Sequence, residues 1–149
     1  MAFKVNKLRR DEYGRISGIL AINKPAGITS HDVVDEVRKA LSMRKVGHAG
    51  ALDPFATGVL VVLVGRATKL SEKFIKADKE YVARILFGIK TDSADPEGNI
   101  LEIAGKPLSI RKSQLESTLQ EFTPSYQQYV PVYSSAKVNG QKLRVLARK

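Results

Sequence analysis

One loop constrains the fold of this 149-residue chain more than any other segment. Residues 47–58 read G-H-A-G-A-L-D-P-F-A-T-G, and the apolar run Val59–Val64 follows at once. The run favours burial, whereas the isolated carboxylate of Asp53 does not. Glycines such as Gly50 permit backbone conformations that other residues avoid, and they let a ligand approach closely. Because Asp-Pro is also a common turn pair, the local chemistry fits a turn role for Asp53 as well as a working carboxylate.

The remaining patterns predict a mixture of strands and helices. The predicted strands are Gly18–Ile22, Val59–Val64, Tyr81–Ile89 and Ile100–Ile103. Four helices are predicted. The first begins at a cap formed by Thr29 or Ser30, and the second spans Ala67–Ile75 with Leu70, Phe74 and Ile75 inward. The third runs from the capping box Ser113–Glu116 to Phe122, and the fourth starts at Gln141. This order of elements indicates an α+β fold rather than regular βαβ winding.

Charge points to the kind of partner. The chain has 25 Lys and Arg against 15 Asp and Glu, a net charge of +10, and its basic residues are bunched within 38–45, 66–79 and 137–149. A polyanion such as RNA is the natural partner of such a surface, although a merely solvated basic face has the same composition. Residues 1–17 are polar and basic and are expected to form an N-terminal arm ahead of a folded part, 18–149.

Several functional classes are excluded. The absence of cysteine rules out disulfides, thiolate zinc sites and cysteine nucleophiles, and two histidines are too few for a histidine metal cluster. Phosphate-loop, dinucleotide-binding and nucleophile-elbow motifs are missing. Asp92 and Asp95 are spaced like metal ligands but lack the rest of a calcium loop. No apolar run is long enough for a membrane span, and basic residues interrupt any signal peptide, so a soluble cytoplasmic protein is expected.

The features that survive are one aspartate, basic surface around it and a tyrosine on a nearby predicted strand. Together with their neighbours they resemble the bacterial tRNA pseudouridine synthases of the TruB type, which modify uridine 55 in the T loop. The matching segments cover nearly all of the chain after the arm: G-I-L-A-I-N-K-P-A-G-I-T-S-H-D-V-V at 18–34, R-K-V-G-H-A-G-A-L-D-P-F-A-T-G-V-L at 44–60, G-R-A-T-K at 65–69, K-E-Y at 79–81, T-D-S-A-D-P-E-G at 91–98, Y-S-S-A-K at 133–137 and K-L-R-V-L-A-R at 142–148.

The resemblance implies a fold and roles for individual residues. The fold is that of pseudouridine synthases, a mixed and mostly antiparallel sheet flanked by helices. Asp53 matches the catalytic aspartate, and Tyr81 matches the tyrosine that stacks on the flipped uracil; taken alone, Tyr81 fits a half-buried strand aromatic better than a catalytic role. The implied substrate-binding residues are His48, which packs into the RNA loop, Lys24, which supports the site from beneath, Arg66 and Lys69, which support the loop or meet phosphate, and Gly50.

The chain also departs from the family pattern. An S-x-G-T-Y-I-R motif, whose arginine pairs with the catalytic aspartate, is absent, as is an RNA-binding domain of the PUA type. Arg144 stands where the family usually has tyrosine. Residues 18–149 therefore correspond to the N-terminal portion of the catalytic domain, and the sheet is expected to be incomplete.

Two functional hypotheses follow. The first is an isomerase that flips uridine 55 of the tRNA T stem-loop and exchanges its C–N for a C–C glycosidic bond with the help of Asp53. It would act as a monomer, without cofactor or metal ion. The second is a truncated, non-catalytic module that binds tRNA or assists RNA folding through its basic face. Intact Asp53 and Tyr81 favour the enzyme, and the missing arginine favours the module.

Overall fold

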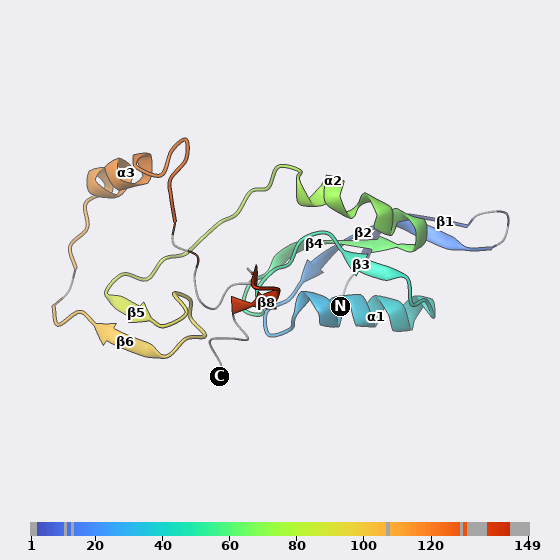
Figure 1. Ribbon diagram of the computed structural model, residues 1–149, viewed down its shortest axis with the longest axis horizontal. Helices are drawn as coiled ribbons and strands as arrows, with labels where there is room; N and C mark the ends of the chain where they lie inside the picture. Colours follow the sequence, from blue (N-terminus) through green and yellow to red (C-terminus); the bar gives the residue numbers. More distant parts are fainter. Residues whose placement is uncertain are drawn as a thin grey trace. The chain divides into compact units, whose positions relative to one another are not determined.

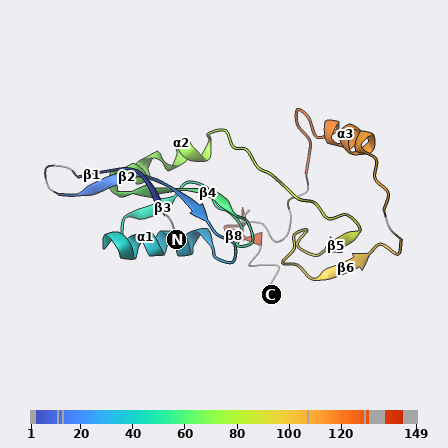
Figure 2. The same ribbon diagram turned by 180° about the vertical axis from the view of Figure 1, so that it is seen from behind.

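The computed structural model describes residues 3–10, 12, 14–106, 108–128, 130 and 137–143. The chain divides into two compact units, Met1–Val82 and Ala83–Lys149, which we call the first and second unit. Figures 1 and 2 label their helices and strands from opposite sides. Antiparallel sheets and helices occur together, which confirms the predicted α+β class.

An antiparallel four-stranded sheet forms the centre of the first unit. Its strand order is β1 (Phe3–Arg10), β2 (Ile16–Lys24), β4 (Gly58–Val64) and β3 (Val46–His48). β2 and β4 pair along their whole shared length, from Gly18 opposite Val64 to Lys24 opposite Gly58. The predicted apolar run is therefore an interior strand, hydrogen-bonded on both sides.

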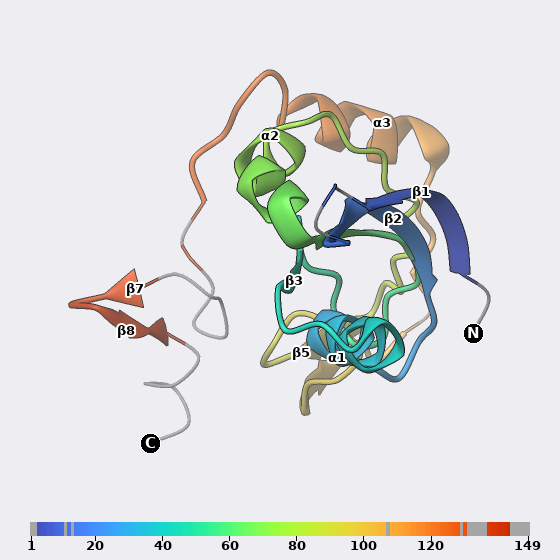
Figure 3. The ribbon, with the colours of Figure 1, turned by 90° about the vertical axis from the view of Figure 1, so that its right-hand side faces the viewer.

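Both faces of this sheet are packed, which explains why the β4 run is apolar without alternation. α1 (Ser30–Leu41) covers one face, and its side chains join a core of Leu20, Ile22, Val33, Val34, Val37, Val46, Leu60, Val62 and Val64. The 3₁₀ helix η1 (Gly65–Leu70) and the short helix α2 (Ser71–Ile75) lie over the other face, where the cluster is Ala49, Leu63 and Ala67, with Ile19, Val61 and Phe74 packed against it. Figure 3 shows α1 and α2 on opposite sides of the sheet.

The start of α1 is fixed by a capping box, with Thr29 rather than Ser30 as the cap. Thr29 Oγ1 accepts from the backbone N–H of Asp32 at 3.1 Å, and the Asp32 carboxylate accepts from the Thr29 backbone N–H at 2.7 Å. Hydrogen bonds from the Thr29 hydroxyl and backbone lower the pKa of Asp32. The helix ends at Ser42, whose backbone is left-handed at φ 50°.

Two expectations for the first unit need correction. The segment 1–17 is expected to form an arm, but β1 lies within it and pairs with β2, which itself begins at Ile16. Leu8 packs against the core and gives this charged segment an apolar side. In place of the single helix predicted at 67–75, the structure has two short helices, η1 followed by α2, and the first of them begins two residues earlier, at Gly65. Phe74 packs inward as predicted, but Leu70 and Ile75 are 43% and 52% exposed.

The second unit consists of small separate elements. β5 (Ile89–Thr91) pairs with β6 (Ile100–Ile103), which confirms the strand predicted at Ile100–Ile103, and β7 (Lys137–Val138) pairs with β8 (Gln141–Lys142). α3 spans Lys112–Gln120. Its first turn is closed by Gln114, whose side chain accepts from the Arg111 backbone N–H at 3.0 Å, so the predicted Ser113–Glu116 box is wrong. The helix predicted from Gln141 does not start there, because Gln141 and Lys142 form β8; Leu143 is helical, and residues 144–149 lie outside the described part.

The predicted strand Tyr81–Ile89 is also wrong. Residues 79–86 are irregular, a turn follows at Phe87 and Gly88, and only Ile89 belongs to a strand. The alternating residues Tyr81, Ile85, Phe87 and Ile89 are all exposed. Alternation shows that a segment can form a strand, whereas a strand also needs a hydrogen-bonding neighbour. No described residue pairs with this segment before Ile89.

Candidate active site

Asp53 lies in the loop that connects β3 to β4. Its side chain is exposed, and the backbone on both sides of it is held by other parts of the first unit. Ala49 N–H donates to Val61 O at 2.9 Å, which extends the β3–β4 pairing into the loop, and Ala56 N–H closes a turn on Asp53 O at 3.0 Å. The carboxylate is thus presented to solvent from an anchored backbone.

Ser30 anchors the residue just before Asp53. Its buried hydroxyl donates to Leu52 O at 3.1 Å and accepts from Leu52 N–H at 2.9 Å, so it satisfies both backbone groups of that residue. Ser30 can do this because Thr29 already caps the helix and leaves the Ser30 side chain free to turn toward the loop. The start of α1 therefore positions the backbone that carries Asp53.

Lys24 anchors the residue just after Asp53. Its side chain is completely buried, and Nζ donates to Pro25 O at 2.9 Å, Ile28 O at 2.7 Å and Pro54 O at 3.1 Å. The Gly27 N–H donates to the same Pro54 oxygen at 2.9 Å. Since an ammonium group has three N–H donors and all are used, Lys24 has none left for a substrate. It supports the loop from beneath, and its place among substrate-contacting residues is corrected accordingly.

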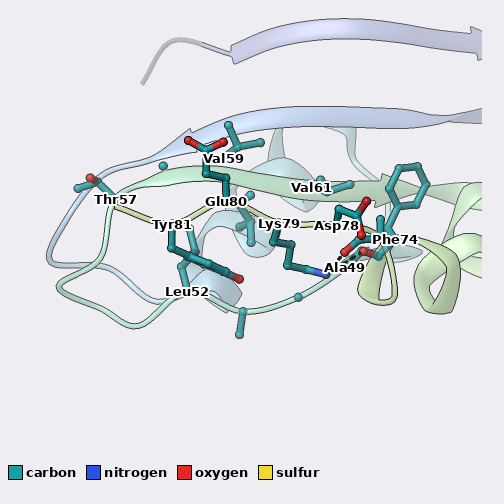
Figure 4. A pocket seen from close by; sticks show the side chains of 15 residues that line it. Ala49, Leu52, Thr57, Val59, Val61, Phe74, Asp78, Lys79, Glu80 and Tyr81 are labelled. Atoms are coloured by element: carbon teal, nitrogen blue, oxygen red, sulfur yellow. Dashed lines mark hydrogen bonds between the residues drawn. The ribbon is translucent and has the colours of Figure 1, made fainter. Parts of the chain in front are cut away.

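A cavity of about 380 Å³ lies beside this loop, on the sheet face that η1 and α2 partly cover. Its lining includes Gly50 and Leu52 before Asp53, Thr57 and Val59 after it, and the segment from Ala77 to Tyr81. Figure 4 shows Tyr81 and Leu52 at one end of the cavity and Phe74 and Ala49 at the other. Asp53 itself is outside the lining, although both flanks of its loop are part of it.

Tyr81 offers an aromatic surface to this cavity. Its side chain is 69% exposed, and no described residue forms a hydrogen bond with its hydroxyl. The ring is carried by irregular chain after α2 and not by the predicted strand. The arrangement can hold a small planar group against an aromatic face, next to a loop that displays a carboxylate.

His48 lies on the other face of the sheet. It pairs with Val62 across β3 and β4, and cross-strand partners share a face. Val62 belongs to the core under α1, so His48 is on the α1 face and not on the face of the cavity. Its Nδ1 is buried and has no hydrogen-bond partner among the described residues. The structure therefore does not bring His48 to Gly50 and Tyr81.

Arg66 and Lys69 are also separated from the Asp53 loop. They follow the far end of β4, and six residue steps at about 3.3 Å put roughly 20 Å between the two ends of that strand. Both side chains are exposed. Among the described hydrogen bonds the loop is held by Ser30 and Lys24, and not by Arg66 or Lys69, whose alternative role in meeting phosphate stays a prediction.

Ser30 is the residue that sequence reasoning missed, since a serine next to Thr29 reads as an alternative cap. A cap needs only one of two adjacent hydroxyls, and this redundancy is the signal that could have identified the second one. Among the described residues, no cluster of three or more His, Cys, Asp or Glu could hold a metal ion. No helix in the described part is long and apolar enough to cross a membrane.

Comparisons with known proteins agree on one family. Residues 38–149 match the model described as TruB family pseudouridylate synthase (N terminal domain). A relative named tRNA pseudouridine synthase B from Caldanaerobacter subterraneus subsp. tengcongensis is 46% identical over 134 residues, covering 90% of this chain and 47% of the relative. Proteins of the same name from Caldicellulosiruptor saccharolyticus and Endomicrobium trichonymphae are 47% and 43% identical over 89% and 91% of this chain, and 45% and 59% of their own lengths. The chain spans about half the length of these curated relatives.

Proposed function

We propose a function from the premise that this chain belongs to the TruB family of pseudouridylate synthases: it supplies the catalytic aspartate and the base-stacking tyrosine of an isomerase that converts uridine 55 of the tRNA T loop to pseudouridine. The observation that carries the proposal is the exposed Asp53 on a doubly anchored loop, beside a cavity that Tyr81 lines. The relatives' names support tRNA as the substrate class.

The reaction is an isomerisation, so substrate and product have the same composition and no second substrate is needed. The bond between N1 of uracil and C1′ of the ribose breaks, and a bond between C5 and C1′ forms. The base must leave the RNA stack and turn before it is rejoined. N1 gains a proton and C5 loses one, which makes proton release from C5 a direct measure of turnover.

Asp53 has to act as an ionised carboxylate at the sugar of the flipped nucleotide, either by adding to it or by driving formation of a glycal. Both routes need the carboxylate to be held in place as the base turns, and the bonds from Ser30 and Lys24 to the neighbouring residues provide this. The cavity would hold the detached uracil, with its ring against Tyr81. In this proposal a monomer acts on the T stem-loop in the cytoplasm, without metal ion or cofactor.

Tritium release from C5-labelled uridine in a T-loop hairpin tests the proposal. The chain and its Asp53→Asn variant are incubated with the hairpin, and hairpin binding is measured in parallel. Release that depends on Asp53 supports the isomerase. Binding by both proteins with release by neither would instead favour the non-catalytic tRNA-binding module and overturn the proposal for this chain.

Tyr81→Phe separates the two roles proposed for the tyrosine. The variant keeps the stacking ring and loses a hydroxyl that no described residue binds, so hairpin affinity should change by less than about threefold. If the hydroxyl assists proton transfer at C5, the single-turnover rate should fall by about 10²-fold. Rates of tritium release at saturating enzyme, together with hairpin binding, provide the measurement.

Tyr81→Leu is the matched comparison, because it removes the ring as well. Stacking of a base on an aromatic side chain contributes about 1–3 kcal/mol, so this variant should bind the hairpin more weakly than Tyr81→Phe. Equal affinity of the two variants would show that the ring does not stack on the base. An effect of Tyr81→Phe on affinity alone would contradict a role of the hydroxyl in the chemistry.

A further inference from the structure

Four basic side chains follow the η1–α2 segment at helical spacing. They are Arg66, Lys69, Lys73 and Lys76, which we call the basic stripe. Their spacings of three, four and three residues place consecutive members on one side of the segment. All four are exposed, whereas Ala67 and Phe74 of the same segment pack against the sheet. The basic stripe therefore runs along the side of the segment that faces solvent.

No described residue neutralises the stripe. None of its four side chains forms an ion pair or hydrogen bond within the described part, and the exposed Glu72 beside them is likewise unpaired. Some other cations are paired, in contrast: Arg38 bonds to Asp35 at 2.8 Å, and Lys39 bonds to Glu36 at 2.9 Å. Lys79, just after the stripe, donates to the carbonyl oxygens of Ile75 and Ala77. Like charges three or four residues apart repel, so an external anion would relieve an unfavourable interaction.

The basic stripe leads to the cavity. The lining segment Ala77–Tyr81 begins directly after Lys76, and Figure 4 shows Phe74, Asp78 and Tyr81 along the same cavity. From Arg66 to Lys76 the segment rises roughly 17 Å, at about 2.0 Å per residue in η1 and about 1.5 Å per residue beyond it. An extended polyanion that enters the cavity at Tyr81 could therefore continue along all four cations.

We propose that the basic stripe binds the sugar-phosphate backbone of the RNA strand whose base occupies the cavity. The substrate in this inference rests on the proposed function, but the contact itself does not require catalysis. Single-stranded nucleic acid is typically held by a basic track beside aromatic side chains, and the stripe together with the exposed Tyr81 has this composition. An anionic membrane is the competing partner, since Leu70 and Ile75 beside the stripe are partly exposed. The continuity with a cavity that has an aromatic wall favours RNA.

The experiment replaces all four stripe residues with Gln, which has a similar helix propensity and removes only the charge. The affinity of the chain for a T-loop hairpin is measured by fluorescence anisotropy over a series of salt concentrations. Loss of four phosphate contacts should reduce the slope of log affinity against log salt by about three. A hairpin of equal length with an unrelated loop should show the same reduction, because phosphates carry no sequence information.

A control variant carries the same charge change elsewhere, with Gln at the exposed positions Lys39, Lys90, Lys106 and Lys112. This variant should keep most of the original slope. Equal slopes for the two variants would overturn the proposal, because only net charge would then matter. The proposal would also be overturned if the stripe variant kept its RNA affinity but lost binding to vesicles containing phosphatidylserine, because the partner would then be an anionic membrane.

The test also distinguishes this inference from the proposed function. Tritium release is not its readout, so a chain that binds RNA through the stripe without isomerising it still satisfies the inference. A chain that isomerises uridine with an unchanged slope in the stripe variant refutes the inference alone. Far-UV circular dichroism checks that the fourfold variant is folded. If the fourfold variant does not fold, single Gln variants of Arg66 and Lys69 are used instead, and each is expected to lower the slope by about one.

Discussion

Replacement of Asp53 by Asn is expected to reduce isomerisation by at least about 10³-fold, while hairpin affinity stays within about threefold of the original. Asn has nearly the same shape but cannot carry the negative charge that either route at the sugar requires. The exposed Asp53 side chain forms no hydrogen bond within the described part, so the substitution removes no contact that holds the fold. Tritium release at saturating protein, compared with anisotropy of the same hairpin, measures the two effects separately.

Asp78→Asn is the matched control for this prediction. Asp78 is a second exposed carboxylate and lines the cavity directly, whereas Asp53 does not. If the chemistry depends on the loop carboxylate, the Asp78 variant should keep its rate within a few fold while losing the same charge. Comparable turnover by the Asp53 variant would refute the assignment. An equal loss in the Asp78 variant would show that the charge near the cavity matters and the position of Asp53 does not.

The parts of the fold that the sequence predicts well are those in which local and tertiary preferences agree. The run Val59–Val64 is apolar at every position, and from Leu60 onward the structure packs it between α1 and the η1–α2 segment, whereas Val59 at the loop end is exposed. α1 has a capping box, a buried face of Val33, Val34 and Val37 and a left-handed end, each of which is a local signal. Such elements are formed by their own residues and then only need to be packed.

Elements that depend on distant partners were predicted poorly. The first residues look like an arm because lysine and arginine dominate them, yet pairing with β2 turns 3–10 into a strand. Residues 81–88 show the reverse case, since they alternate clearly and still have no strand partner in the described part. Strand pairing is decided by contacts that single-sequence patterns do not contain, which is why both errors concern strands.

The candidate site divides in the same way. The motif identifies Asp53, and the loop glycines and Tyr81 do meet at one cavity as local chemistry suggests. The register of β3 puts His48 on the opposite face, and the length of β4 separates Arg66 from the loop. The link between Ser30 and Leu52 joins positions 22 residues apart, so no local pattern announces it.

Lys24→Met is expected to lower the free energy of unfolding by about 2–5 kcal/mol. Methionine has a similar length and volume, so the packing around position 24 should survive. The ammonium group, however, is fully buried and serves the carbonyls of Pro25, Ile28 and Pro54. Pro54 O keeps its bond from Gly27 N–H, whereas Pro25 O and Ile28 O lose the donor that Lys24 gave them. A buried acceptor that loses its donor costs about 1–3 kcal/mol, and the two carbonyls together account for the expected range, because water partly replaces the donor at the exposed Pro25.

Denaturant unfolding followed by circular dichroism measures this loss, with Lys39→Met as the control. Lys39 is an exposed lysine of α1 that is paired with Glu36 on the surface, so its replacement should change the free energy of unfolding far less than the replacement of Lys24. Equal stability of the two variants would mean that water replaces the Lys24 ammonium and that the carbonyls beneath the loop do not depend on it. A large loss at position 24 alone would show that the Asp53 loop is held by a buried cation. The lysine that sequence analysis grouped with the substrate contacts would then act on catalysis only through the position of the loop.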